Sequence, residues 1–106
     1  MDAIVVFMTT PTREEAVRIA DLLVGARLAA CVQILPEIES VYRWEGKIER
    51  QSEVLLVAKS TTKKFAELER EVRAIHSYET PEIIAVPASE ISEPYLKWLD
   101  ANLKGR

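Results

Sequence analysis

The chain has 106 residues, with 14 basic and 17 acidic side chains and a formal net charge of −3. This length predicts one domain, residues 1–106, that can bury a core without metal or disulfide staples, and the acidic balance argues against a nucleic-acid partner. A single cysteine excludes an internal disulfide and favours a reducing cytoplasm, and the apolar run at residues 3–8 is too short for a signal peptide or a membrane span.

The first part of the chain predicts a strand followed by a helix. Residues 3–9 are apolar on both faces, which is typical of a buried central strand. A capping box from Thr12 to Glu15 predicts the start of a helix, and apolar residues at helical spacing continue it until Gly25.

Two long strands joined by a tight turn are predicted between residues 28 and 59. Pro36 cannot donate a ladder hydrogen bond, which predicts a bulge or an edge position there. Glu45 and Gly46 form the turn, and because Glu resists a positive φ, we expect a type I turn with a bulge at glycine rather than a type I′ turn. Only residues 54–58 of the second strand form a continuous apolar run, so the far end of this hairpin should project beyond the core.

The remaining elements are a helix, a strand and a second helix. Helical spacing of apolar residues predicts a helix that begins around residues 60–62 and ends near His76, before Pro81. Residues 83–88 predict a fourth strand, and Ser92 caps a final helix. The order β-α-β-β-α-β-α predicts an α+β sandwich with both main helices on one face of a four-stranded sheet.

The other face of that sheet is predicted to be apolar as well. Val5, Phe7, Leu55 and Ile84, or their neighbours in the pleat, would form a broad exposed patch in a monomer, so we expect a closed homo-oligomer. The aromatic residues on the projecting part of the hairpin are predicted interface anchors, namely Tyr42 and Trp44.

Two residues are candidates for metal binding or proton transfer. Cys31 could be a thiolate ligand, but its alanine and valine neighbours favour a small core hydrophobe. His76, the only histidine, lies close in sequence to Tyr78, Glu79 and Glu82, which could bind a divalent ion or shuttle a proton. Equally, His76 could bond to the last carbonyls of its helix.

Lys59 ends the third predicted strand and Glu82 opens the fourth. Parallel pairing of these two strands could therefore bring the two side chains to a shared edge of the sheet. A salt bridge is the simpler outcome there, and a site for an anion or an amphoteric ligand is the alternative. Trp98 lies off the apolar stripe of the last helix and could cap the core or face a neighbouring subunit. The sequence contains no glycine-rich phosphate loop, GxSxG or HExxH, so it predicts no catalytic residue and no enzyme class.

Several segments resemble, in order and spacing, the family of the divalent-cation tolerance protein CutA. They read LAACVQI, SVYRWEGKIE, EVLLVAK, HSYETPEIIAVP and YLKWL. The resemblance covers nearly the whole chain and implies a ferredoxin-like βαββαβ fold with a long projecting hairpin and an extra C-terminal helix. It also implies a cytoplasmic homotrimer related to the PII signalling proteins, with a role in tolerance of copper and other divalent cations.

The resemblance implies site residues only in part. Copper-binding members use a thiol near the end of the first strand and histidines at the end of the second helix. Here Met8 takes the thiol position and Ile75 precedes His76, so Met8 and His76 are the candidate ligands for copper or another divalent cation, which folding should not require. The residues implied for an intersubunit ligand pocket are Lys59, Tyr78, Glu82 and Trp98.

Three functions are therefore open. The preferred one is a non-enzymatic trimer that responds to divalent ions, through weak metal binding or PII-like signalling. The second is a small-molecule receptor or enzyme that uses the intersubunit pocket, and the third is a scaffold that anchors a partner protein through the trimeric surface.

Overall fold

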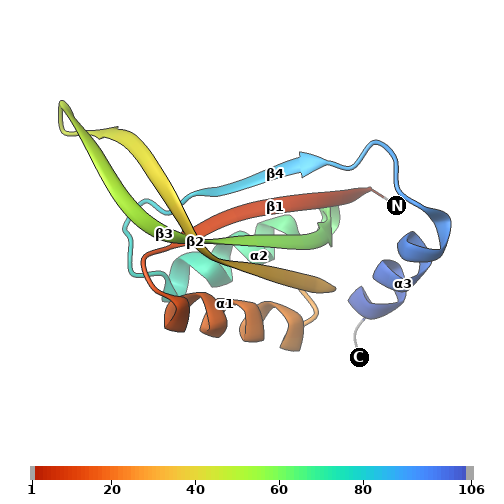
Figure 1. Ribbon diagram of the computed structural model, residues 1–106. Coiled ribbons are helices and arrows are strands. Elements are labelled where there is room, and N and C mark those ends of the chain that lie inside the picture. Colours follow the sequence, from red (N-terminus) through yellow and green to blue (C-terminus); the bar gives the residue numbers. More distant parts are fainter. Residues whose placement is uncertain (1, 105–106) are drawn as a thin grey trace.

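The chain folds into a four-stranded sheet with helices packed against it, as a computed structural model describes for residues 2–104 (Figure 1). The elements are β1 (Ala3–Thr10), α1 (Arg13–Gly25), β2 (Cys31–Trp44), β3 (Lys47–Thr61), α2 (Thr62–Ile75), β4 (Ile83–Pro87) and α3 (Glu93–Leu103). The predicted α+β order is confirmed. The strands lie in the order β2-β3-β1-β4, and every neighbouring pair is antiparallel.

The helices α1 and α2 cover one face of the sheet, and α3 lies beyond the strand ends (Figure 1). α1 begins as predicted, because Thr12 Oγ1 accepts a hydrogen bond from the Glu15 backbone N–H at 3.2 Å. The predicted capping box forms only in part, since the Glu15 carboxylate accepts a hydrogen bond from the Ser77 N–H instead. No helix within residues 2–104 combines the length and apolarity needed to cross a bilayer.

The core lies between these two helices and the sheet. Its fully buried side chains include Val6, Met8, Ile19, Leu23, Leu56, Leu68 and Val72. β1 and β3 supply alternate residues to it, because successive side chains of a strand point to opposite faces. The other half of each strand therefore faces away from the helices.

That opposite face is apolar and incompletely covered. Val5, Phe7 and Leu55 are half buried, and Ile84 is 53% exposed. Phe7 pairs in register with Val57 of β3 and with Ile84 of β4, so these side chains lie side by side. The predicted second apolar face is confirmed within one chain.

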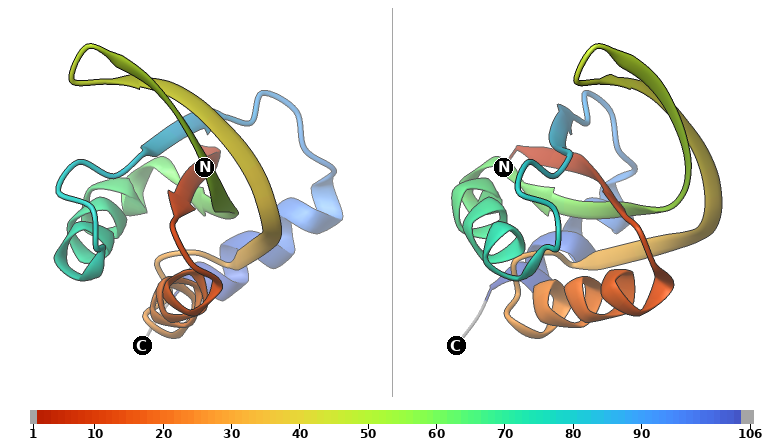
Figure 2. Two further views of the ribbon diagram at one scale, coloured as in Figure 1. Left: turned by 60° about the vertical axis from the view of Figure 1, so that its left-hand side comes forward. Right: turned by 90° about the vertical axis from the view of Figure 1, so that its left-hand side faces the viewer.

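The β2–β3 hairpin leaves the sheet and arches over the side that faces away from α1 and α2 (Figure 2). Every residue from 41 to 50 is exposed, which confirms the predicted projection. Its turn differs from the prediction: Glu45 and Gly46 have φ of 50° and 80°, which is the pattern of a type I′ turn. The twist of two long strands favours this turn, and the gain outweighs the roughly 1–2 kcal/mol cost of a left-handed Glu.

A bulge interrupts β2 at Pro36, as predicted. Leu35 pairs with Leu55 and Ile38 pairs with Glu53, so two residues of β2 oppose one residue of β3. An extra residue in one strand reverses which of its side chains share a face with the partner strand. Beyond the bulge, the even-numbered residues of β2 therefore lie on the same side as the odd-numbered residues of β3.

Candidate functional site

A cavity of about 680 Å³ opens between the β2–β3 hairpin and the loop that joins α2 to β4. Its volume falls within the range of roughly 300–1,000 Å³ that is typical of small-molecule pockets. Aromatic rings and carboxylates dominate its wall. These side chains are Tyr42, Trp44, Tyr78, Glu53, Glu79 and Glu82.

The bulge at Pro36 decides which hairpin residues line the cavity. Tyr42 and Trp44 follow the bulge on β2 and share a face with Gln51 and Glu53 of β3. Without the extra residue, a strand of the same sequence would turn Tyr42 and Trp44 to the opposite side. The aromatic wall is therefore a consequence of one local irregularity.

A chain of hydrogen bonds crosses the cavity wall from the hairpin to the loop. Tyr42 Oη donates to Gln51 Oε1 at 2.7 Å, and Gln51 Nε2 donates to Tyr78 Oη at 3.1 Å. Tyr78 Oη in turn donates to Glu53 Oε2 at 2.8 Å. Each donor in this chain points toward the Glu53 carboxylate, whose residue is only 7% exposed.

Burial and the neighbouring Glu53 tune the acidity of this site. Desolvation, followed by the hydrogen bond to Glu53, raises the pKa of Tyr78 to about 12. Tyr78 therefore keeps its proton at neutral pH, which makes it a poor general acid or base. Burial is also the main cause that raises the pKa of Glu82, and the charge of Glu53 adds to it.

His76 fixes the loop that carries Tyr78. Its Nδ1 accepts a hydrogen bond from the Tyr78 N–H at 2.9 Å, and its Nε2 lies 2.8 Å from the Thr9 carbonyl oxygen. This pattern assigns the ring proton to Nε2, which donates to Thr9. The Glu15 carboxylate lies 3.3 Å from Nδ1 and accepts the Ser77 N–H at 2.8 Å, so it ties α1 to the same loop.

Met8 and His76 are not arranged as metal ligands in this chain. Met8 is fully buried in the core, and both ring nitrogens of His76 bond to backbone groups. Within residues 2–104, no group of three His, Cys, Asp or Glu side chains is placed to hold a metal ion. A metal role for Met8 and His76 stays a prediction, and it would require His76 to release a backbone partner.

The four residues predicted for a ligand pocket do not meet in one chain. Tyr78 and Glu82 line the cavity, whereas Lys59 and Trp98 do not. The predicted parallel pairing of Lys59 with Glu82 is wrong, because β1 separates β3 from β4 and all pairs are antiparallel. Lys59 Nζ instead bonds to Gln33 Oε1. A pocket that unites the four residues between subunits stays a prediction.

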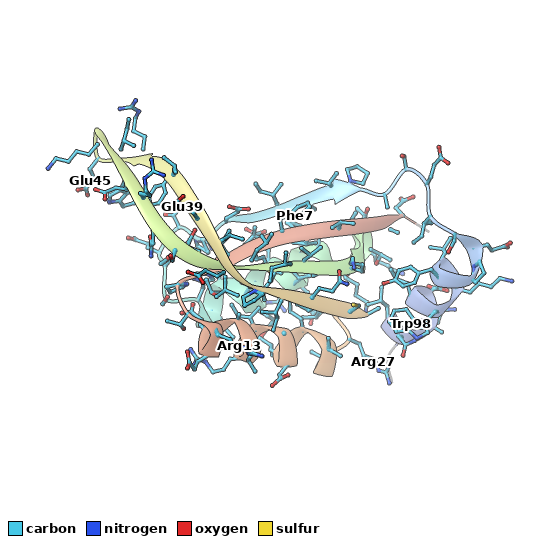
Figure 3. The ribbon with its side chains drawn as sticks, in the orientation of Figure 1. Phe7, Arg13, Arg27, Glu39, Glu45 and Trp98 are labelled. Atoms are coloured by element: carbon cyan, nitrogen blue, oxygen red, sulfur yellow. The ribbon has the colours of Figure 1, made fainter. Side chains whose placement is uncertain are left out.

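Trp98 lies on α3, at the far end of the molecule from the hairpin tip at Glu45 (Figure 3). Its side chain is 44% exposed. Cys31, which was expected in the core, is half buried on the open face opposite Lys59. Neither residue contributes to the cavity.

Sequence reasoning missed Gln51 and Glu53 as site residues. They lie in the polar half of β3, where a polar run predicts exposure to solvent. The bulge in the partner strand and the arching of the hairpin bring their side chains to the cavity, and neither feature can be read from the residues of β3. A buried carboxylate in that polar run has no distinctive sequence pattern.

Comparison with known proteins extends these observations. The family model described as CutA1 divalent ion tolerance protein matches residues 4–102. The divalent-cation tolerance protein CutA of Thermus thermophilus is 47% identical over 98 residues, which cover 92% of this chain and 95% of that protein. Protein CutA, chloroplastic, of Arabidopsis thaliana is 46% identical over 97 residues, which cover 92% of this chain and 53% of that protein, so this chain spans about half of the plant relative.

The fold agrees with a solved structure as well. The structure described as periplasmic divalent cation tolerance protein CutA from Archaeoglobus fulgidus has a TM-score of 0.93 and 42% sequence identity. That comparison covers 96% of this chain and 99% of the other. With sequence and fold in agreement over almost the whole length, this chain belongs to the CutA1 divalent ion tolerance protein family.

Proposed function

We propose that this chain forms a homotrimer that serves in tolerance of copper or other divalent cations, and that it is not an enzyme. The names of its relatives describe tolerance of divalent cations rather than a reaction. The one geometric observation that supports an assembly is the exposed apolar surface of the open face of the sheet and of the hairpin. The high pKa of Tyr78 supports a non-catalytic role for the cavity.

The apolar surface includes large side chains on both the hairpin and β4. Ile48 is 69% exposed, Trp44 56% and Val41 53% on the hairpin, and Ile84 and Val86 are 53% and 44% exposed on β4. Burying such residues against copies of the same chain would remove this surface from water, and closed symmetry limits the growth of the assembly. Tyr42 and Trp44 are the proposed anchors of the interface.

A metal ion would bind weakly under this proposal. An ion at His76 must displace either the Tyr78 N–H or the Thr9 carbonyl from the ring. Losing a buried backbone hydrogen bond costs about 1–3 kcal/mol, which subtracts from the binding free energy of the metal. Copper or another divalent cation is thus a ligand and not a requirement for folding.

A cytoplasmic location is part of the same proposal. The only cysteine, Cys31, cannot form an internal disulfide, and this suits a reducing compartment. Two of the relatives are described as chloroplastic and periplasmic, so location varies among the proteins that this chain resembles.

Titration calorimetry with Cu(II), Cu(I) and Zn(II) tests the metal proposal. We expect weak, saturable heats for the wild type and their loss in His76→Ala. Ile75→Ala is a matched control, because Ile75 is 41% exposed and carries no ligand atom in its side chain. Equal and negligible heats for all three proteins would remove the metal proposal. Sedimentation tests the assembly, and a monomer at micromolar concentration would contradict it.

The cavity supports a second candidate function, that of a small-molecule receptor. Tyr78 and Glu82 line it together with residues of the hairpin that we propose to carry the interface. A ligand bound there would contact the element that joins subunits, which would give the trimer a PII-like signalling role.

A further inference from the structure

We propose that the cavity between the hairpin and the α2–β4 loop binds a small organic ammonium ion. The carboxylates of Glu53 and Glu82 would form ion pairs with the ammonium group, and the rings of Tyr42, Trp44 and Tyr78 would pack against the ligand. This inference rests on the receptor candidate above and names its ligand class. It does not depend on the metal proposal.

The charge of the cavity wall favours a cation. Glu53, Glu79 and Glu82 line the cavity, and none of the described residues that line it is Lys, Arg or His. Within the part of the chain that the structure describes, no ion pair forms with any of these three carboxylates. A positively charged ligand would therefore meet carboxylates whose charge the protein has not offset.

Glu53 is the one buried carboxylate among the three that line the cavity. This residue is 7% exposed, and its Oε2 accepts one hydrogen bond from the Tyr78 hydroxyl. Its other carboxylate oxygen, Oε1, accepts no side-chain hydrogen bond from residues 2–104, and no buried side-chain oxygen of the described residues lacks a partner. Oε1 is therefore open to solvent in the cavity that Glu53 lines. An oxygen that faces the cavity can accept a hydrogen bond from a ligand, and such bonds are strong when the donor is charged. An ammonium group supplies both the opposite charge and the N–H donors.

The aromatic wall favours an organic cation over a bare metal ion. Tyr42, Trp44 and Tyr78 line the same cavity, and aromatic faces attract cations that lie within about 6 Å of the ring centroid. A divalent metal instead needs several ligand atoms at about 2–2.6 Å, and residues 2–104 offer no such group of three side chains. A cavity of about 680 Å³ leaves room for an apolar body attached to the charged group.

The titration of Glu82 should couple to binding. Burial and the charge of Glu53 both raise the pKa of Glu82, and a bound cation would offset the charge of Glu53. The other titratable groups that face it across the cavity are Tyr42, Tyr78 and Glu79. An ammonium ligand should therefore bind more tightly as the pH rises through the raised pKa of Glu82.

The test compares phenethylamine, which is a cation at neutral pH, with phenethyl alcohol, its neutral counterpart. Both are titrated by calorimetry into the full chain in its native assembly. We expect the amine to bind at least about tenfold more tightly than the alcohol, because it adds charge-assisted hydrogen bonds. Glu53→Gln and Glu82→Gln should each lower the affinity for the amine by roughly tenfold. Glu90→Gln, an exposed carboxylate outside the cavity, should leave the affinity unchanged.

Three results would overturn the inference: equal affinity for amine and alcohol, wild-type affinity in Glu82→Gln, or no binding of either compound. Glu53→Gln could impair folding because Glu53 is buried, but Glu82 lines the cavity with an exposed side chain, so Glu82→Gln keeps the test decisive. Metal titrations on the same samples separate the two proposals. Metal binding without amine binding overturns only this inference, and amine binding without metal binding overturns only the metal proposal.

Discussion

The Tyr78 hydroxyl joins the hairpin to the α2–β4 loop, and Tyr78→Phe removes it with almost no change in shape. The variant loses the bond that Tyr78 donates to Glu53 Oε2 at 2.8 Å and the bond that it accepts from Gln51 Nε2 at 3.1 Å. A hydrogen bond to a charged group contributes about 1.5–3 kcal/mol, and a neutral one about 0.5–1.5 kcal/mol. Because the cavity admits water to Glu53, we expect the lower end, about 2 kcal/mol of lost unfolding free energy.

Urea unfolding at a fixed protein concentration measures this loss, and the concentration is fixed because dissociation would contribute to the transition. With a slope of about 1–3 kcal/mol per molar urea, the midpoint should fall by roughly 1 M. Tyr42→Phe is the matched control, since Tyr42 is 39% exposed and donates a single bond to Gln51. Its cost should stay below about 0.5 kcal/mol.

A double-mutant cycle with Glu53→Gln isolates the bond itself. If the charge of Glu53 is what Tyr78 stabilises, the cost of Tyr78→Phe should shrink by about 1 kcal/mol in the Gln background. A Tyr78→Phe variant that unfolds with the same midpoint as Tyr42→Phe would refute the reasoning that the cavity wall depends on this bond.

Three further predictions concern other parts of the molecule. Glu82→Gln should raise the melting temperature at pH 7. The folded-state pKa of Glu82 is raised, so the contribution of Glu82 to stability is present at low pH and is lost as the pH rises through that pKa. The gain should vanish below about pH 4, and a gain that persists there in thermal melts would contradict the sign. Trp44→Ala should weaken the trimer more than the fold, which sedimentation and unfolding measured together will show, and an unchanged oligomer would count against Trp44 as an anchor. His76→Ala should cost about 2–4 kcal/mol and speed hydrogen exchange at the Tyr78 amide, because the Tyr78 N–H loses its acceptor.

Local sequence patterns predicted much of the fold because their causes are local. The Thr12 hydroxyl caps α1 from within three residues, and Pro36 breaks the ladder at its own position. The turn type was wrong for a different reason. The preference of Glu45 against positive φ is also local, but the twist of two long strands overrode it.

The site was less predictable because it depends on pairing between distant segments. Their closeness to His76 in the sequence makes Tyr78 and Glu82 candidates for a divalent ion or a proton shuttle, and the family resemblance implies that they belong to a ligand pocket. Both line the cavity. The pairing of Lys59 with Glu82 assumes that β3 and β4 are neighbours, but β1 lies between those strands. The pocket that the family resemblance implies for Lys59 lies between subunits and stays a prediction. Gln51 and Glu53 were missed because a bulge in another strand, β2, decides which side chains share their face of the sheet.

The central place of β1 constrains the order in which this chain can fold during synthesis. β1 is translated before both of its partners, which are residues 54–61 on β3 and residues 83–87 on β4. Helix α1 and the β2–β3 hairpin need only nearby contacts, so they can form earlier, while pairing across long separations is slow. A nascent chain that ends before residue 54 therefore carries an apolar first strand with no partner in the sheet. Such a strand is prone to aggregation, and we expect translation beyond β3 to protect it.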